Sequence, residues 1–101
     1  MAIGADYINR VRQYIRISAT TFDGEISDLI NAARADLALG GVTSERVNDE
    51  TDPLILRAVG TYVKAEFGID NPDAEGYRAA YKALKIQLLH SDKYIIPAEG
   101  G

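Results

Sequence analysis

The residues of this chain that could support chemistry are few, and their spacing forms no catalytic group. His90 is the only histidine, and the absence of cysteine excludes disulfides and thiolate metal sites from this sequence. Because His90 falls near the end of a predicted helix, where positive charge is favourable, we interpret it as a surface or capping residue. Serine and threonine residues have no His–acid partners at a spacing that predicts nucleophilic catalysis.

The densest group of carboxylates lies between residues 45 and 52 and is the best candidate for a metal site. Glu45, Asp49, Glu50 and Asp52 could bind calcium in principle. They lack the alternating spacing and central glycine of an EF-hand loop. The two glycines at residues 40–41 are not followed by the lysine, and do not have the spacing, of a phosphate-binding loop. We therefore predict no catalytic residue, no metal site and no cofactor, and we interpret the acidic segment as a solvated loop.

The composition indicates one small globular domain. The chain has 101 residues, of which 47% are hydrophobic and 26% charged, and this leaves room for a single core. No apolar run approaches the roughly 20 residues that cross a bilayer. The first residues lack the basic region and apolar core of a secretion signal. We expect a protein that is made in a bacterial cytoplasm and contacts no membrane.

Apolar residues recur at helical spacing in four segments and predict an all-α fold. The predicted helices cover residues 6–17, 22–39, 53–67 and 72–91. The fold is expected to be a single-domain bundle of about four helices, with a long acidic loop and an extended C-terminal tail. We divide it into a helical domain, residues 1–91, and a tail or arm, residues 92–101. The third helix is apolar on most sides, which predicts a central or covered position.

The sequence contains recognisable signals for the start and the end of the third helix. Asp52 can accept hydrogen bonds from the first turn, and Pro53 occupies a position where its missing N–H costs nothing. Gly68 can adopt the left-handed conformation that ends a helix, and Asn71-Pro72 is expected to start the next one. Gly60 lies inside this helix. Either another helix approaches closely at this position, or the helix simply tolerates a glycine despite its low helix propensity.

Two segments are predicted to be irregular. Residues 41–51 are polar and acidic, and this composition predicts a connecting loop. In the tail, Tyr94, Ile95 and Ile96 are consecutive and precede Pro97, with no helical spacing. Either these residues fold back over the end of the bundle, or they form an extended arm that adds to a partner.

Charge is distributed unevenly along the chain, whose net charge is −4. The first 21 residues carry three arginines against one acid, while residues 22–52 carry eight acids against two arginines. Such asymmetry suits subunits that meet basic face to acidic face, although two solvated helix faces would show it too. Tyr7 and Tyr14 lie off the apolar stripe of the first helix, so we expect them to be partly exposed. An acidic protein is a poor general DNA binder.

Several segments, in their order and spacing, resemble the small head–tail connector (adaptor, or head-completion) proteins of tailed bacteriophages. They are the stretch from Ile26 to Leu37, Asp-Pro-Leu-Ile at 52–55, Tyr-Val-Lys-Ala-Glu-Phe-Gly at 62–68, and the series Tyr77, Tyr81 and Leu84. The resemblance implies a helical subunit of a homo-oligomeric ring at the head–tail junction of the virion. Such a ring docks under the portal protein, extends the DNA channel and joins the head to a stopper or tail-completion protein.

The resemblance gives the charged and apolar residues expected roles. A subunit interface would use Arg10, Arg12, Arg16, Asp28 and Asp36; contacts to the portal or a neighbouring ring would use Val47, Asp49, Glu50, Tyr94, Ile95 and Ile96. DNA would pass through the channel without specific binding, because an acidic lumen repels phosphate. The alternative function is a small helical DNA-binding or regulatory protein, since four short helices can contain a helix-turn-helix.

Overall fold

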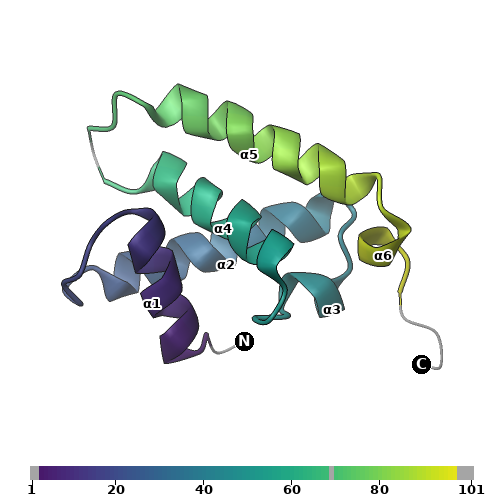
Figure 1. Ribbon diagram of the computed structural model, residues 1–101, viewed down its shortest axis with the longest axis horizontal. Coiled ribbons are helices and arrows are strands. Elements are labelled where there is room, and N and C mark those ends of the chain that lie inside the picture. The colour runs from purple at the N-terminus through teal and green to yellow at the C-terminus, as the bar shows by residue number, and fades with distance from the viewer. Residues whose placement is uncertain (1–2, 69, 98–101) are drawn as a thin grey trace.

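The computed structural model describes residues 3–68 and 70–97, and all of its regular secondary structure in these residues is helical. These residues form six helices, shown in Figure 1: α1 (Ala5–Tyr14), α2 (Asp23–Gly40), α3 (Ser44–Val47), α4 (Pro53–Glu66), α5 (Ala74–Leu89) and α6 (Asp92–Ile95). The all-α prediction is therefore confirmed. Four of the helices are long, and two are single turns that the sequence pattern did not predict.

Helix α4 is the centre of the fold, in agreement with its wide apolar surface. It packs against α1, α2 and α5, and in Figure 1 it lies between α5 along one edge and α1 and α2 on the other side. Ile55, Val59 and Val63 on α4 are fully buried, as are Ile30 and Leu37 on α2. These side chains form one contiguous core.

The predicted start of α4 is confirmed in atomic detail. Asp52 Oδ1 accepts hydrogen bonds from the backbone N–H of Leu54, at 2.9 Å, and of Ile55, at 3.2 Å. Pro53 is the first helical residue. After the helix ends, Gly68 adopts a φ of 84°, the left-handed conformation that the sequence predicted.

Gly60 allows α1 to cross α4 at close range. A Cβ atom at this position would lie 2.6 Å from Cγ of Tyr14 and 2.7 Å from two further ring atoms. The aromatic ring of Tyr14 therefore rests on the backbone of α4 where a side chain would otherwise project. Of the two explanations for Gly60, close approach is the one that the structure supports.

The first and the last long helix have boundaries that differ from the predictions by two residues or more. The first helix ends at Tyr14 rather than at residue 17, because Arg16 turns into the left-handed region with a φ of 58°. The last long helix starts at Ala74 rather than at residue 72. The reason is that Asn71 closes the preceding helix: its Nδ2 donates to the carbonyl of Lys64 at 2.9 Å.

The segments that were expected to be irregular each contain one helical turn. Within residues 41–51, Thr43 is followed by α3, and Val47 anchors that turn in the core. Residues 92–95 form α6, so the described part of the tail, which ends at residue 97, is not an extended arm. The predicted tail residues 98–101 lie outside the described residues.

Candidate interaction surfaces

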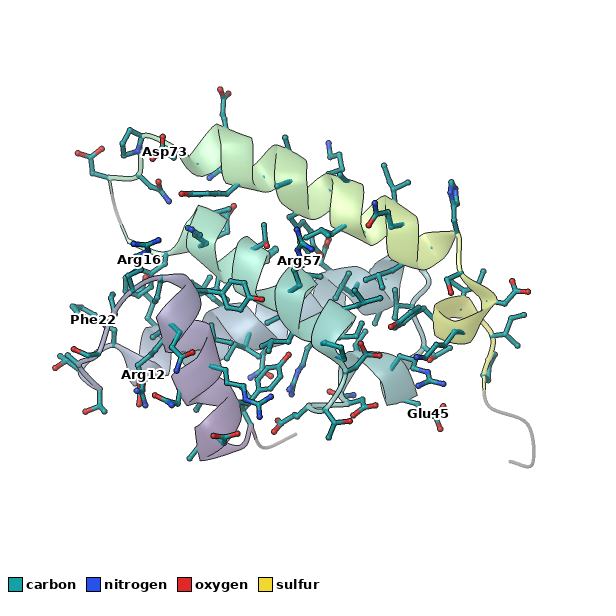
Figure 2. All side chains as sticks on the ribbon, viewed as in Figure 1. Arg12, Arg16, Phe22, Glu45, Arg57 and Asp73 are labelled. Atoms are coloured by element: carbon teal, nitrogen blue, oxygen red, sulfur yellow. The ribbon has the colours of Figure 1, made fainter. Side chains whose placement is uncertain are left out.

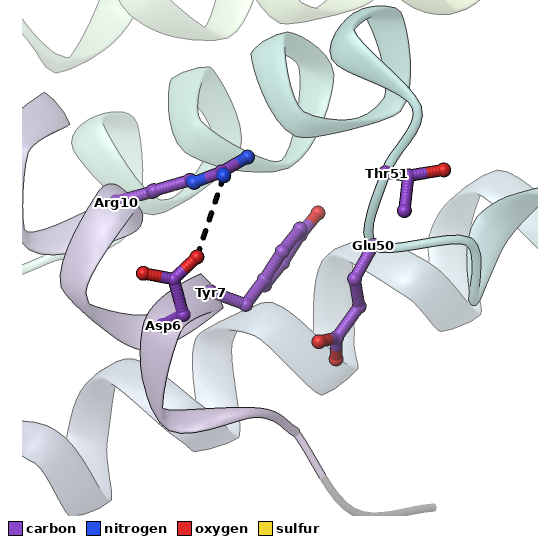
Figure 3. A pocket seen from close by; sticks show the side chains of 5 residues that line it. All are labelled: Asp6, Tyr7, Arg10, Glu50 and Thr51. Carbon is purple, nitrogen blue, oxygen red and sulfur yellow. Dashed lines mark ion pairs between the residues drawn. The ribbon is translucent and has the colours of Figure 1, made fainter.

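A pocket lies between the first turn of α1 and the chain that leads into α4. Figure 3 shows its lining side chains, which are Asp6, Tyr7, Arg10, Glu50 and Thr51. Arg10 pairs with Asp6 along α1, with 3.3 Å between the charged atoms. The pocket thus brings together one basic and one acidic residue from α1 with an acid from the predicted portal-contact segment.

Glu50 on the wall of this pocket has a structural partner inside the protein. Its Oε2 accepts hydrogen bonds from Nη2 of Arg34 and from the backbone N–H of Gly4, both at 3.1 Å. Arg34 is 5% exposed, and its guanidinium carbon lies 5.1 Å from the centre of the Tyr7 ring. Glu50 therefore neutralises a buried cation and also ties the segment before α1 to the segment before α4.

Tyr7 is buried beside this ion pair, and the prediction that it is partly exposed is wrong. Only 2% of its surface is accessible, and burial is the main cause that raises the pKa of its hydroxyl. Its hydroxyl and Nε of Arg34 have no hydrogen-bond partner among the described protein atoms. Tyr14, by contrast, is partly exposed as expected.

Asp49 forms a local turn. Its Oδ1 accepts hydrogen bonds from the hydroxyl of Thr51, at 2.6 Å, and from the N–H of the same residue, at 3.0 Å. These two bonds lower the pKa of the Asp49 carboxyl, the hydroxyl bond contributing most. The turn positions Asp52 directly before α4 and leaves the Asp49 side chain at the surface.

The C-terminal turn α6 is attached to α3 and to the start of α4. The Tyr94 hydroxyl donates to Oδ1 of Asp52 at 3.1 Å, and the Thr43 N–H donates to the Tyr94 carbonyl at 2.8 Å. Nε of Arg46 donates to the carbonyl of Lys93 at 3.1 Å. Burial, followed by the bond to Asp52, raises the pKa of Tyr94 to about 12. Through residue 97, the structure follows the fold-back interpretation of the tail.

The predicted portal-contact residues consequently fall into two groups. Val47 and Tyr94 are each 3% exposed, so their side chains belong to the core. Ile95 and Ile96 are 36% and 53% exposed and lie beside the buried Tyr94. The apolar surface at this end of the molecule is therefore made by the two isoleucines, held in place by the tyrosine.

The predicted subunit-interface residues are also divided by the structure. Nε of Arg12 pairs with Asp23 in the same chain at 2.9 Å, and Asp36 pairs with Lys85 at 3.0 Å. Arg16 and Asp28 are exposed, and neither forms an ion pair within the described ranges. Figure 2 places Arg16 close to Phe22, at the end of the molecule opposite Glu45.

Asp36 joins α2 to α5 through two side chains that sequence reasoning did not connect to it. Its Oδ2 accepts hydrogen bonds from the Tyr81 hydroxyl at 2.5 Å and from Nζ of Lys85 at 3.0 Å. The bond from Tyr81 is the main cause that lowers the pKa of Asp36. Lys85 lies on the same helix as Tyr81. Its position four residues after Tyr81 was the available signal that both could reach one carboxylate.

Neither a metal-binding cluster nor a membrane-spanning helix is present in residues 3–68 and 70–97. No group of three or more histidine, cysteine, aspartate or glutamate side chains is arranged there to hold a metal ion. None of the helices in this part of the chain has the length and apolar character needed to span a membrane. His90 is exposed and is the C-cap residue of α5, as the sequence indicated.

Comparison with known proteins identifies the family. The sequence model of the family described as "Phage connector protein" matches residues 8–94, from within α1 to within α6. Neither the curated proteins nor the solved structures contain a significant match. Because the family match spans most of the chain and nearly all of the helical domain, it agrees with the resemblance found in the sequence. The chain belongs to the phage connector protein family, and it is a structural connector protein of a phage.

Proposed function

We propose that this protein is a subunit of a homo-oligomeric ring that docks under the portal of a phage head. The ring extends the DNA channel and joins the head to the stopper or tail. The observation that carries this proposal is the family match over residues 8–94, which includes every long helix in whole or in part. The net charge of −4 agrees with a channel that repels the DNA passing through it.

The end of the molecule formed by α3 and α6 is the surface that we assign to the portal or the neighbouring ring. Ile95 and Ile96 present exposed apolar side chains there, and Glu45 and Asp49 add charge around them. A small apolar centre with a charged rim is the usual composition of a protein–protein contact. Val47 and Tyr94 support this surface from the core. The Glu50 side chain is 31% exposed and faces the pocket beside the first turn of α1, so it would contribute at the edge of such a contact.

The subunit contacts of the ring would use the charges that no other residue within 3–68 and 70–97 neutralises. Among the five predicted interface residues, Arg16 and Asp28 meet this condition within the described residues, while Arg10, Arg12 and Asp36 are paired inside the protein. A paired residue can still contribute at an interface. However, the unpaired ones gain most from a partner of opposite charge.

Portal-bearing, DNA-filled heads from the source phage test the proposal directly. The purified protein is incubated with the heads, which are then sedimented and imaged by electron microscopy. We expect an added ring at the portal vertex. If a well-folded protein leaves the vertex unchanged, the docking role is wrong, and low-salt DNA binding becomes the next measurement.

A matched pair of variants identifies the docking surface. Ile95→Asp together with Ile96→Asp changes only exposed side chains and keeps Tyr94 in the core. We expect this variant to lose docking on the order of tenfold or more, because charges replace the apolar centre of the contact. Arg57→Glu, an exposed change on α4 at a distance from α6, is the control and is expected to dock normally.

A further inference from the structure

The outer face of α5 carries a groove that no part of the described chain covers. It is lined by Glu75, Arg78, Ala79, Lys82, Ala83 and Ile86. The two alanines make its floor shallow, and Ile86 is 49% exposed. Arg78 reaches across to Glu66 of α4, at 2.7 Å, whereas Lys82 forms no ion pair within residues 3–68 and 70–97. The groove thus offers an apolar end at Ile86 and a charged end, where Glu75 and the paired Arg78 lie beside Lys82, whose charge is unpaired in the described residues.

The outer face of α2 has the opposite character. Asp28, Ala35 and Leu39 follow one another at helical spacing on the side that points away from α4 and α1. Leu39 is 89% exposed, the largest exposed fraction among the large apolar side chains described. Asp28 is exposed and forms no ion pair in the described part of the chain. This face therefore has an acidic end, a small centre and an apolar end.

We infer that the groove on α5 of one copy receives the outer face of α2 of a neighbouring copy. This inference rests on the proposed ring and names the contact that builds it. In a ring of more than two subunits each contact joins two different surfaces. These two faces carry unpaired charges of opposite sign, Asp28 and Lys82, and each has an exposed apolar side chain at one end. The contact pairs Asp28 with Arg78 and Lys82, places Leu39 against Ile86, and lets the alanines bring the two helices close together.

The lengths of the two faces agree when the helices run in the same direction. Asp28 and Leu39 are about 16 Å apart along α2, and Arg78 and Ile86 are about 12 Å apart along α5, at 1.5 Å per residue. The arginine side chain is long enough to span the difference, and Lys82 lies between the two ends of the groove. In Figure 1, α5 lies along one edge of the molecule and α2 lies behind α1 and α4, so one copy can present both faces at once. Asp28 thus finds its partners on α5 rather than on the arginines of α1.

Cross-linking of single-cysteine variants tests the contact, because the sequence contains no cysteine of its own. Ala35→Cys and Ala83→Cys change exposed alanines on the two faces. The two proteins are mixed, in solution and on portal-bearing heads, and treated with a short cysteine-specific cross-linker. We expect a dimer in the mixture and almost none with either protein alone. An Ala83→Cys homodimer of equal yield would show that α5 meets α5, and it would overturn the inference.

Charge reversal gives a second, independent measurement. Lys82→Glu and Asp28→Lys are each expected to lower the cross-linked yield on the order of tenfold, and the double variant to restore it. Arg57→Glu is the control and should leave the yield unchanged. Rings at the portal vertex without the mixed cross-link would overturn this contact but retain the proposed function. The mixed cross-link in solution without rings on the heads would retain the contact and reject docking.

Discussion

Arg34 and Glu50 form an ion pair that joins the middle of α2 to the chain before α4, with 3.1 Å between Nη2 and Oε2. The arginine side chain is 6% exposed and the glutamate side chain 31%. The pair therefore lies at the edge of the core, where the carboxylate keeps contact with water. Because the same oxygen accepts the Gly4 N–H, one carboxylate holds three segments of the chain together.

Glu50→Ala is expected to lower the free energy of unfolding by about 1–3 kcal/mol. The change leaves the Arg34 guanidinium buried without its carboxylate and removes the acceptor of the Gly4 N–H. The loss is smaller than for a fully buried pair, because Glu50 is partly in water. Urea denaturation measures it, with the exposed Glu45→Ala as control. Equal stability of these two variants would mean that the ion pair contributes nothing.

Gly60→Ala is expected to destabilise the protein by about 1–3 kcal/mol, although alanine favours helix formation. The new methyl group would lie 2.6 Å from the Tyr14 ring and would push α1 away from α4. Gly24→Ala on α2 is the matched control. A Cβ there meets nothing within 4 Å, so this variant should gain up to about 1 kcal/mol. Thermal unfolding of both distinguishes the effects, and a stabilised Gly60→Ala would show that the crossing tolerates a side chain.

Arg16→Gly is expected to raise stability by about 0.5–1 kcal/mol. Arg16 has a φ of 58°, and the N–H of Ile17 donates to the carbonyl of Arg12 at 3.0 Å, which is the bond that closes a left-handed helix end. Glycine adopts this conformation without steric conflict. Arg16→Ala keeps the Cβ and should show no gain; if both variants gain equally, loss of the positive charge is the cause instead.

The contribution of Tyr94 to stability is expected to disappear at alkaline pH. Its pKa is 10.0 in an unfolded chain and about 12 in the folded protein, so the unfolded chain releases the proton first as pH rises. Stabilisation by this hydroxyl is complete below pH 10 and is lost as the pH rises through about 12.

Comparison of the wild-type protein with Tyr94→Phe measures this effect. The variant lacks the hydrogen bond to Asp52 and should be less stable by about 1–2 kcal/mol at pH 7. Urea denaturation between pH 7 and pH 12 should show the two proteins converging. A constant difference over this range would contradict the assigned role of the hydroxyl, because the titration of the other tyrosines is common to both proteins.

The four long helices could be predicted from the sequence because their signals are local. Asp52 and Pro53 mark a helix start, Gly68 marks an end, and apolar residues at helical spacing fill the intervals. The short helices α3 and α6 could not be predicted in this way. They are stabilised by contacts between distant residues, such as the Thr43 N–H with the Tyr94 carbonyl. No window of neighbouring residues contains that information.

The charged residues of the candidate surfaces could also be predicted only in part, because their partners lie far away in the sequence. The sequence indicated that Arg12 and Asp36 carry charge at helix faces, but it could not reveal that Asp23 and Lys85 neutralise them within the chain. An unpaired charge is recognised only after every intramolecular pair is known. Asp28 was already expected at a subunit interface from the sequence, but Lys82 became a candidate for contact with a neighbouring copy only from the three-dimensional structure.

Asp52 accepts hydrogen bonds from residues that are far apart in the sequence and are therefore synthesised at different times. Its carboxylate starts α4, while its third hydrogen-bond donor, Tyr94, is added 42 residues later by the ribosome. A chain that ends before Tyr94 would keep the two backbone donors that start α4 but would lack the third donor to Asp52, so the site that receives α6 would stay open.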